Sequence, residues 1–358
     1  EGSHTMRKGI LALGTGLAAL SLLVAACGGQ PTKPAAAQEA TPEATEASKT
    51  LVVYTGRKEE MLKPVFDAFE KKTGVKVVAK AAGATELASL IMEEKKAPKA
   101  DIYIANDAGA LEKLRMDASL EPYTSENLSK VPTDLKAADN SWYAVTARAR
   151  VIMYNKDLVK ESELPKSLKD LADPKWKGQV AMATGANESV IANITALRLL
   201  DGDQATEQFL TDLKNNGLKV LKSHTDTRQA VGKGEVKLGW VNHYYYHLQL
   251  AEKEHNRVGV IYPDQEGRGV TVNISGAAIV KGAKNLSNAK AFMDFLLEPD
   301  TQQIFAEANY EMPVLPGVAT RDARPLSEIK RDGVKLGDFG TEWDHSAKLI
   351  DKLGLVLK

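Results

Sequence analysis

Residues 51–79 read LVVYTGRKEEMLKPVFDAFEKKTGVKVVA, a stretch that contains two strand patterns on either side of a helix pattern. Residues 51–54 form a short apolar run, which predicts a strand. From residue 59 to residue 72 large apolar side chains recur at helical spacing, and Thr73-Gly74 predicts the end of the helix. Residues 75–79 predict the next strand. A helix between two strands favours parallel pairing of the strands, because the helix carries the chain back.

The same alternation continues along the chain. Further helices are predicted over residues 85–95 and 109–115, and a strand over residues 101–105. Such a pattern is typical of an open α/β sheet with helices on both faces. Ligands of these sheets bind beyond the carboxyl ends of the strands, so we examined the residues that follow each predicted strand.

The first 27 residues have the pattern of a secretion signal. We interpret residues 1–5 as a tag remnant, after which two basic residues precede an apolar run that ends in Ala25-Ala26-Cys27. This ending resembles the bacterial lipobox, which predicts a lipid on Cys27 and attachment to a membrane. The alternative is an ordinary signal peptide with an incidental cysteine. Cys27 is the only cysteine, so no disulfide can form within the chain.

Residues 28–49 lack large apolar side chains and predict a flexible linker. The remaining chain, about 310 residues, is long enough for two lobes with separate cores. Basic and acidic residues number 47 each, and this balance gives no indication of a nucleic-acid partner.

Three predicted strand ends carry polar groups. The first strand is followed by Thr55-Gly56-Arg57-Lys58, which places two cations at the start of a helix, where backbone N–H groups favour an anion. A strand over residues 179–183 is followed by Thr184-Gly185 and a helix that extends to Leu200. A strand over residues 237–241 is followed by residues 242–247, NHYYYH. These turns predict one binding site.

The run Tyr244-Tyr245-Tyr246 has two interpretations. Adjacent tyrosines are common in packed cores and interfaces. At a strand-to-helix turn, however, neighbouring phenols can point into one cleft, and a trivalent cation can displace their protons. The phenolate is then a hard oxygen ligand. Arg57 beside a cation indicates that an anion joins the coordination shell.

Several blocks of the sequence, taken together, resemble the periplasmic ferric-binding proteins. The blocks are VYTGRKE (53–59), DIY (101–103), RARV (148–151), KWK (175–177), TGA (184–186), NHYY (242–245) and SGAA (275–278). The resemblance implies a two-lobe periplasmic-binding-protein fold with two crossover strands, near Arg148 and Val272. The implied first lobe comprises residues 50–147 and 273–322, and the second comprises residues 148–272 and 323–358.

The resemblance also implies a function and a site. The chain would be the extracytoplasmic solute-binding component of an ABC importer, a monomer anchored by its lipid on the outer or periplasmic face of the membrane, with a membrane permease as its partner. Its ligand would be Fe³⁺ with a synergistic anion such as carbonate. Tyr244 and Tyr245 correspond to the iron ligands, and the implied anion contacts are Arg57, Arg148, Thr184, Gly185, His224 and Asn242.

The sequence departs from the family at the remaining ligands. Where some members have histidine and glutamate, this chain has Lys58 and Asn106, and residues 184–188 contain none of the third tyrosines that other members use. Water, Glu188 or a tyrosine from elsewhere would complete the shell.

Other interpretations were weighed against iron binding. The same fold and Arg57 would suit another anionic solute, such as a phosphate ester, phosphonate or sulfate, but that ligand needs no tyrosine pair. The spacing of His243 and His247 could indicate zinc, although no third ligand follows a recognisable pattern. Tyr143, Tyr154 and Tyr246 are expected to be packing residues. We found no catalytic constellation and predict that the chain is not an enzyme.

Overall fold

The structure, a computed structural model, describes residues 49–357. Its first group of strands is parallel: β1 pairs with both β2 and β3, as the sequence predicts. The predicted strands and helices of this part are confirmed, with ends displaced by one or two residues. The elements are β1 (Thr50–Thr55), α1 (Glu59–Thr73), β2 (Lys76–Ala81), α2 (Ala84–Glu93), β3 (Ile102–Ala105) and α3 (Ala108–Met116).

A second group of parallel strands is formed by β6, which pairs with β7 on one side and β8 on the other. Helices connect these strands, so this part of the chain repeats the strand–helix alternation of the first. Its elements are β6 (Val180–Ala183), α5 (Glu188–Asp201), α6 (Asp203–Asn215), β7 (Lys219–Leu221), α7 (His224–Gly232), β8 (Leu238–Asn242), α8 (His243–Leu250) and β9 (Val258–Ile261).

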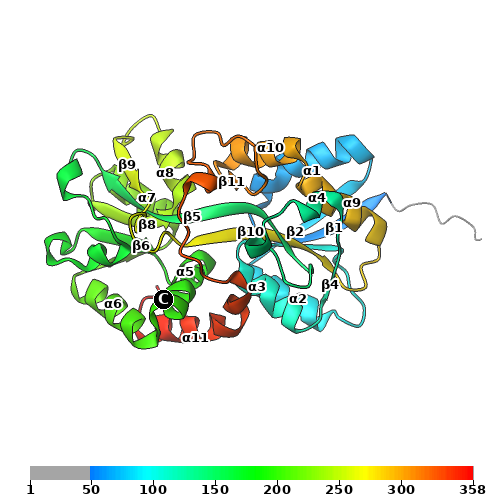
Figure 1. Cartoon of the computed structure of the whole chain (residues 1–358), viewed down its shortest axis with the longest axis horizontal. Coiled ribbons are helices and arrows are strands. Elements are labelled where there is room, and N and C mark those ends of the chain that lie inside the picture. The colour runs from blue at the N-terminus through cyan, green and yellow to red at the C-terminus, as the bar shows by residue number, and fades with distance from the viewer. Residues whose placement is uncertain (1–48, 358) are drawn as a thin grey trace, which may run out of the picture. The chain divides into compact units, whose positions relative to one another are not determined.

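Two antiparallel strands join the groups, β5 (Tyr143–Asn155) and β10 (Val272–Val280). The first half of β5 pairs with β10 and with β11 (Met312–Pro313), and its second half pairs with β8 and β9. The strand order is β2-β1-β3-β10-β5-β8-β6-β7. Figure 1 shows β5 and β10 running side by side between the two groups. This is the two-lobe fold with crossover strands, and we call the part around β1–β3 the first lobe and the part around β6–β8 the second.

Within residues 49–357, the remaining elements are four helices, six short 3-10 helices and one short strand. They are β4 (Leu120–Glu121), α4 (Glu126–Ser129), α9 (Leu286–Leu296), α10 (Pro299–Asn309), α11 (Phe339–Lys352), η1 (Thr133–Leu135), η2 (Glu161–Glu163), η3 (Leu168–Ala172), η4 (Pro174–Trp176), η5 (Leu326–Glu328) and η6 (Leu336–Asp338). Within residues 49–357, no helix has the length and apolar character needed to cross a membrane.

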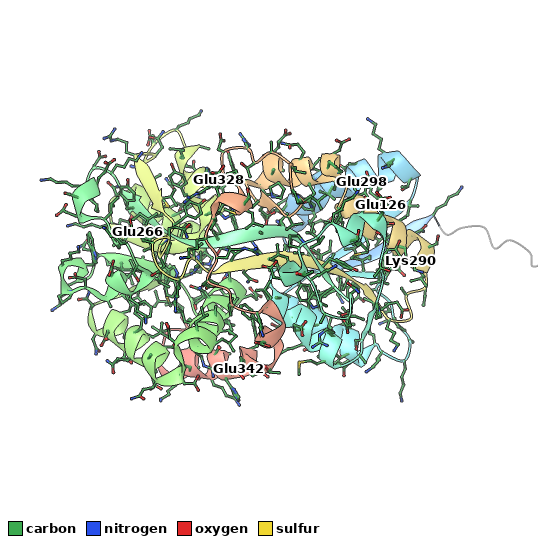
Figure 2. The ribbon with its side chains drawn as sticks, viewed as in Figure 1. Glu126, Glu266, Lys290, Glu298, Glu328 and Glu342 are labelled. Atoms are coloured by element: carbon green, nitrogen blue, oxygen red, sulfur yellow. The ribbon has the colours of Figure 1, made fainter. Side chains whose placement is uncertain are left out.

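Helix α11 contacts both lobes, packing against α3 of the first and α5 of the second (Figure 1). Glu342, labelled on α11 in Figure 2, forms an ion pair with Arg198 of α5 at 3.1 Å. On the other side, Lys113 of α3 pairs with Asp344 at 2.6 Å. The tail, which we assigned to the second lobe, therefore also contacts the first. The lobe boundaries stay a prediction, and Cys27, the signal and most of the linker lie outside the described residues.

Candidate functional site

A cavity of about 250 Å³ lies where the ends of several strands meet. It is lined by the β1–α1 turn, the residue after β3, the crossover strand β5, the start of α5 and α7, and the β8–α8 turn. The lining residues are Gly56, Arg57, Lys58, Met61, Asn106, Arg148, Asn187, Glu188, Ser189, His224, Asn242, Tyr244 and Tyr245. The cavity thus lies at the carboxyl ends of the strands, where ligands of such sheets bind.

The tyrosine pair lies in the first turn of α8. Because α8 begins at His243, directly after β8, both phenols stay near the strand end. The two rings lie 4.4 Å apart at 35° to each other, and Asn242 Nδ2 donates a hydrogen bond to the Tyr244 hydroxyl at 3.4 Å. Burial raises the pKa of Tyr245, and the neighbouring Tyr244 raises it further, while Arg148 and Arg150 oppose the shift. The Tyr245 phenol therefore keeps its proton unless a strong cation replaces it.

Arg57 is buried at the edge of the cavity, with 2% of its side chain exposed. Its Nη2 donates to Glu311 at 2.7 Å, and its Nη1 has no hydrogen-bond partner among the described residues. Thr146 also donates to Glu311, at 3.2 Å. The protein thus holds part of the guanidinium, and the buried Nη1 of this cavity-lining residue can still donate a hydrogen bond.

Two more arginines come from the crossover strand β5. Arg148 lines the cavity and donates to the carbonyls of Asn106 and, at 2.7 Å, Ile274. Arg150 lies behind the tyrosines, where burial lowers its pKa to about 9 against the opposing influence of Tyr244 and Tyr245. We did not predict Arg150. Arg150 lies two residues after Arg148, so the two side chains are on the same face of the strand. This spacing would have allowed us to predict Arg150 from the sequence.

His224 and Asn242 both line the cavity, as predicted, and both contact Arg150. The Arg150 Nη1 donates to Asn242 Oδ1 at 3.3 Å and lies 3.2 Å from His224 Nε2. Burial lowers the pKa of His224 well below its usual value, and Arg150 and Arg148 lower it further. The ring is therefore neutral. Since arginine can only donate, His224 Nε2 accepts, and Nδ1 carries the proton.

Thr184 and Gly185 do not line the cavity. The Thr184 hydroxyl accepts a hydrogen bond from the Leu357 N–H at 3.0 Å, and the Gly185 N–H donates to the Leu355 carbonyl at 2.8 Å. Both groups are thus occupied by the C-terminal segment. The residues that follow them, 187–189, face the cavity instead. Contact of Thr184 and Gly185 with an anion stays a prediction.

The other tyrosines have packing environments. The Tyr246 ring lies 4.9 Å from that of His247, and the Tyr143 hydroxyl donates to the Tyr123 carbonyl at 2.5 Å. The Tyr154 ring fills the space beside Gly259.

His243 is committed to backbone groups rather than to a metal. Its Nδ1 accepts from the Ala149 N–H at 3.3 Å, and its Nε2 donates to the Tyr310 carbonyl at 2.9 Å. Burial lowers its pKa to about 3. Over residues 49–357, no cluster of three or more His, Cys, Asp or Glu side chains is arranged to hold a metal ion. A site for Fe³⁺ would therefore depend on the phenols.

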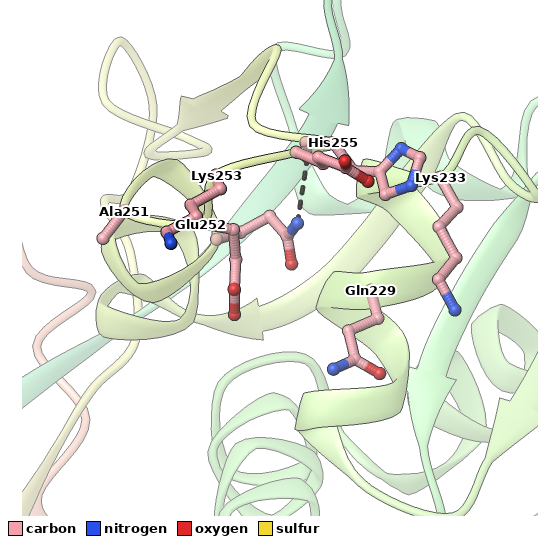
Figure 3. Close-up of a pocket in the computed structure, with 8 residues that line it drawn as sticks. Gln229, Lys233, Ala251, Glu252, Lys253 and His255 are labelled. Carbon is pink, nitrogen blue, oxygen red and sulfur yellow. Dashed lines mark hydrogen bonds between the residues drawn. The ribbon is translucent and has the colours of Figure 1, made fainter.

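A larger hollow, of about 620 Å³, lies at the ends of α7 and α8 (Figure 3). Its lining includes Lys233, Glu252 and His255, and the Gln249 amide donates to the His255 carbonyl at 2.9 Å. Lys233 and Glu252 are exposed surface side chains. No residue that we predicted for the site lines this hollow.

The sequence and the structure were compared with those of known proteins, and the similar proteins are solute-binding or iron-binding proteins. Residues 97–332 match the family described as bacterial extracellular solute-binding protein. The chain is 32% identical to iron uptake protein A1 of Synechocystis, over 97% of this chain and 98% of that protein. It is 30% identical to the major ferric iron-binding protein of Neisseria meningitidis, over 87% and 95% of the two chains. Among solved structures, the IdiA (FutA) protein of Trichodesmium in complex with iron and citrate has a TM-score of 0.76 and 32% identity, over 86% of this chain and 99% of that one.

Proposed function

Since the chain belongs to the bacterial extracellular solute-binding proteins, we propose that it captures ferric iron outside the cytoplasm and delivers it to the membrane permease of an ABC importer. The family is one of transport components rather than enzymes. The resemblance to ferric-binding proteins seen in the sequence is confirmed by relatives that carry that name. The observation that carries the proposal is the tyrosine pair, which shares one cavity with Arg57, Lys58 and Arg148.

Tyr244 and Tyr245 supply the principal ligands in this proposal. Phenolate oxygens are hard donors, which suits a small ion of high charge, and iron binding would release both phenolic protons. Arg148 and Arg150 only partly oppose the effect of burial, which raises the pKa of Tyr245 above its usual value. The ion-free protein therefore keeps the neutral phenol, and the cation has to displace the proton.

A synergistic anion, such as carbonate, would occupy the basic side of the cavity. The Nη1 of Arg57 is a buried donor without a partner, and Lys58 is exposed and forms no ion pair among the described residues. Arg148, His224 and Asn242 line the same cavity. The Trichodesmium structure is in complex with iron and citrate, so we consider a small carboxylate as well as carbonate as the anion of this chain.

The location and attachment follow from the N-terminal sequence. We propose that Cys27 is lipidated, that residues 28–49 are the linker, and that the protein works as a monomer on the outer or periplasmic face of the membrane. Mass spectrometry of the protein from its native membrane tests the lipid, and Cys27→Ser should release the protein into the soluble fraction. Membrane retention of that variant would contradict the anchor.

Titration separates iron from the alternative anionic solutes. Purified protein should develop a visible absorption band with Fe³⁺ and bicarbonate, because phenolate-to-iron charge transfer absorbs visible light. Its thermal unfolding temperature should also rise, since a ligand that binds the native state stabilises it. Phosphate esters, phosphonates and sulfate should leave both readouts unchanged. A colourless protein that is stabilised by one of these anions would instead support the alternative.

A further inference from the structure

The proposed iron site lacks a third anionic protein ligand, and the start of α5 provides a candidate. Among the described residues that line the cavity, Glu188 is the only one with a carboxylate. We infer that Glu188 is a direct ligand of the ferric ion, together with Tyr244 and Tyr245. This inference rests on the proposed function.

The local structure leaves the Glu188 side chain free. Asn187 caps α5 by accepting from the Ser189 N–H at 3.0 Å, and the Ser189 hydroxyl lies 2.8 Å from His224 Nε2. Both neighbours are therefore committed to the protein. Glu188 forms no hydrogen bond or ion pair with its side chain within residues 49–357. As the first residue of a 14-residue helix, it also lies at the positive end of the helix dipole, which stabilises a negative charge.

Two buried carboxylates of the first lobe, those of Glu311 and Asp107, lie outside the cavity lining. Glu311 is bound to Arg57 and Thr146. Asp107 is fully buried, and its Oδ1 caps α3 by accepting from the Ala110 N–H at 2.9 Å, while its buried Oδ2 has no partner among the described residues. Neither lines the cavity. Glu188 is thus the acid that remains available to a ligand.

The position of Glu188 also suits an ion held between the lobes. Glu188 belongs to the second lobe, and Asp107 lies at the start of α3 in the first lobe. Burial is the main reason why the pKa of Asp107 is raised, and the negative charge of Glu188 raises it further. Glu188 also lines the same cavity as Arg57, Lys58 and Asn106 of the first lobe, and Arg57 has the unpartnered Nη1.

Charge balance favours the assignment. Two phenolates and one carboxylate carry three negative charges, which equal the charge of Fe³⁺, and a buried ion is tolerated only when its charge is compensated. The negative charge of the synergistic anion would then be matched by Arg57, Lys58 and Arg148. All ligands in this arrangement are oxygen donors, as a hard cation prefers.

The test compares Glu188→Gln with Glu59→Gln in the full chain. Glu59 is an apt control because it is also the first residue of a helix, is exposed and does not line the cavity. Iron affinity is measured by competition with EDTA at a fixed bicarbonate concentration, and the visible spectrum is recorded at saturation. Circular dichroism confirms that both variants are folded.

Glu188→Gln should weaken iron binding at least about 10-fold, because mutation of a residue that only supports a metal ligand already lowers metal affinity about 10–100-fold. It should shift the visible band without abolishing it, because the phenolates remain. Glu59→Gln should match the parent chain. Parental affinity and an unshifted band in Glu188→Gln would overturn the Glu188 assignment and leave the proposed function intact. A parent chain that develops no colour with Fe³⁺ would refute the proposed function itself.

Discussion

The ion pair between Arg57 and Glu311 provides a quantitative test of how the first lobe holds its basic group. Its N···O distance is 2.7 Å, and the two side chains are 2% and 0% exposed. Lys63 and Asp67 form a pair with the same 2.7 Å distance, but their side chains are 67% and 58% exposed. The two pairs therefore differ mainly in burial, and one can serve as the control for the other.

The expected magnitudes follow from this difference. At 2.7 Å the Coulomb energy is about 1.5 kcal/mol in bulk water and about 6 kcal/mol at an effective dielectric constant of 20. Breaking a buried pair typically costs about 3–5 kcal/mol, because the remaining charge is left uncompensated. We expect Glu311→Gln to lose about 3 kcal/mol, since glutamine keeps an oxygen acceptor for Arg57. Asp67→Asn should lose no more than about 0.5 kcal/mol.

Urea unfolding of the iron-free protein at neutral pH measures both variants. The slopes of free energy against urea should stay equal, so that the midpoints report stability alone. Added salt should reduce the small effect at Asp67 and leave the effect at Glu311 nearly unchanged, because buried charges are poorly screened. Equal losses in Glu311→Gln and Asp67→Asn would refute the reasoning.

Three further predictions concern the tail, pH and lobe closure. Gly185→Ala would place a Cβ 2.1 Å from Cγ2 of Ile350, so we expect the free energy of unfolding in urea to fall by about 1–3 kcal/mol. Gly337→Ala, whose Cβ would have no atom within 4 Å, should leave that free energy unchanged. Equal effects of the two substitutions would contradict the tight packing of the tail. Burial raises the pKa of Asp107 from 3.8 to about 7, so the folded state binds its proton more tightly and parent stability should fall as pH rises through this window. This fall amounts to at most about 4 kcal/mol of unfolding free energy, and Asp107→Asn should remove it. If the difference in stability between this variant and the parent did not vary with pH, the raised pKa of Asp107 would be contradicted. Finally, Fe³⁺ should reduce the radius of gyration at neutral pH, because an ion held by both lobes binds the closed form better; an unchanged radius despite stoichiometric binding would mean that one lobe holds the metal alone.

The parts of the site that depend on neighbouring residues were predictable from the sequence. Strands and helices followed their apolar periodicity. The turns after β1 and β8, which line the cavity, could be singled out because their polar groups follow directly on strand ends. Tyr244, Tyr245 and Asn242 share a single turn, so their proximity needed no tertiary information.

Contacts between distant residues were not predictable in this way. Glu311 reaches Arg57 from 254 residues away, and nothing in the local sequence around Arg57 indicates a buried partner. The turn at Thr184 and Gly185 was correctly placed after a strand, but its donor and acceptor groups are taken by residues near the end of the chain. The antiparallel pairing of β5 with β10 is likewise long-range, and the helical spacing that predicts parallel pairing contains no sign of it.

Visible absorption of the iron-loaded tyrosine variants tests the central claim most directly. Tyr244→Phe and Tyr245→Phe remove hydroxyls that line the cavity, and Tyr246→Phe is the matched control from the same helix turn, outside the cavity. With Fe³⁺ and bicarbonate at neutral pH, the first two variants should each lose most of the charge-transfer band and bind iron far more weakly, while Tyr246→Phe should retain both the band and the affinity. A full band with parental affinity in Tyr244→Phe and Tyr245→Phe would contradict the claim that this pair of phenolates holds the iron.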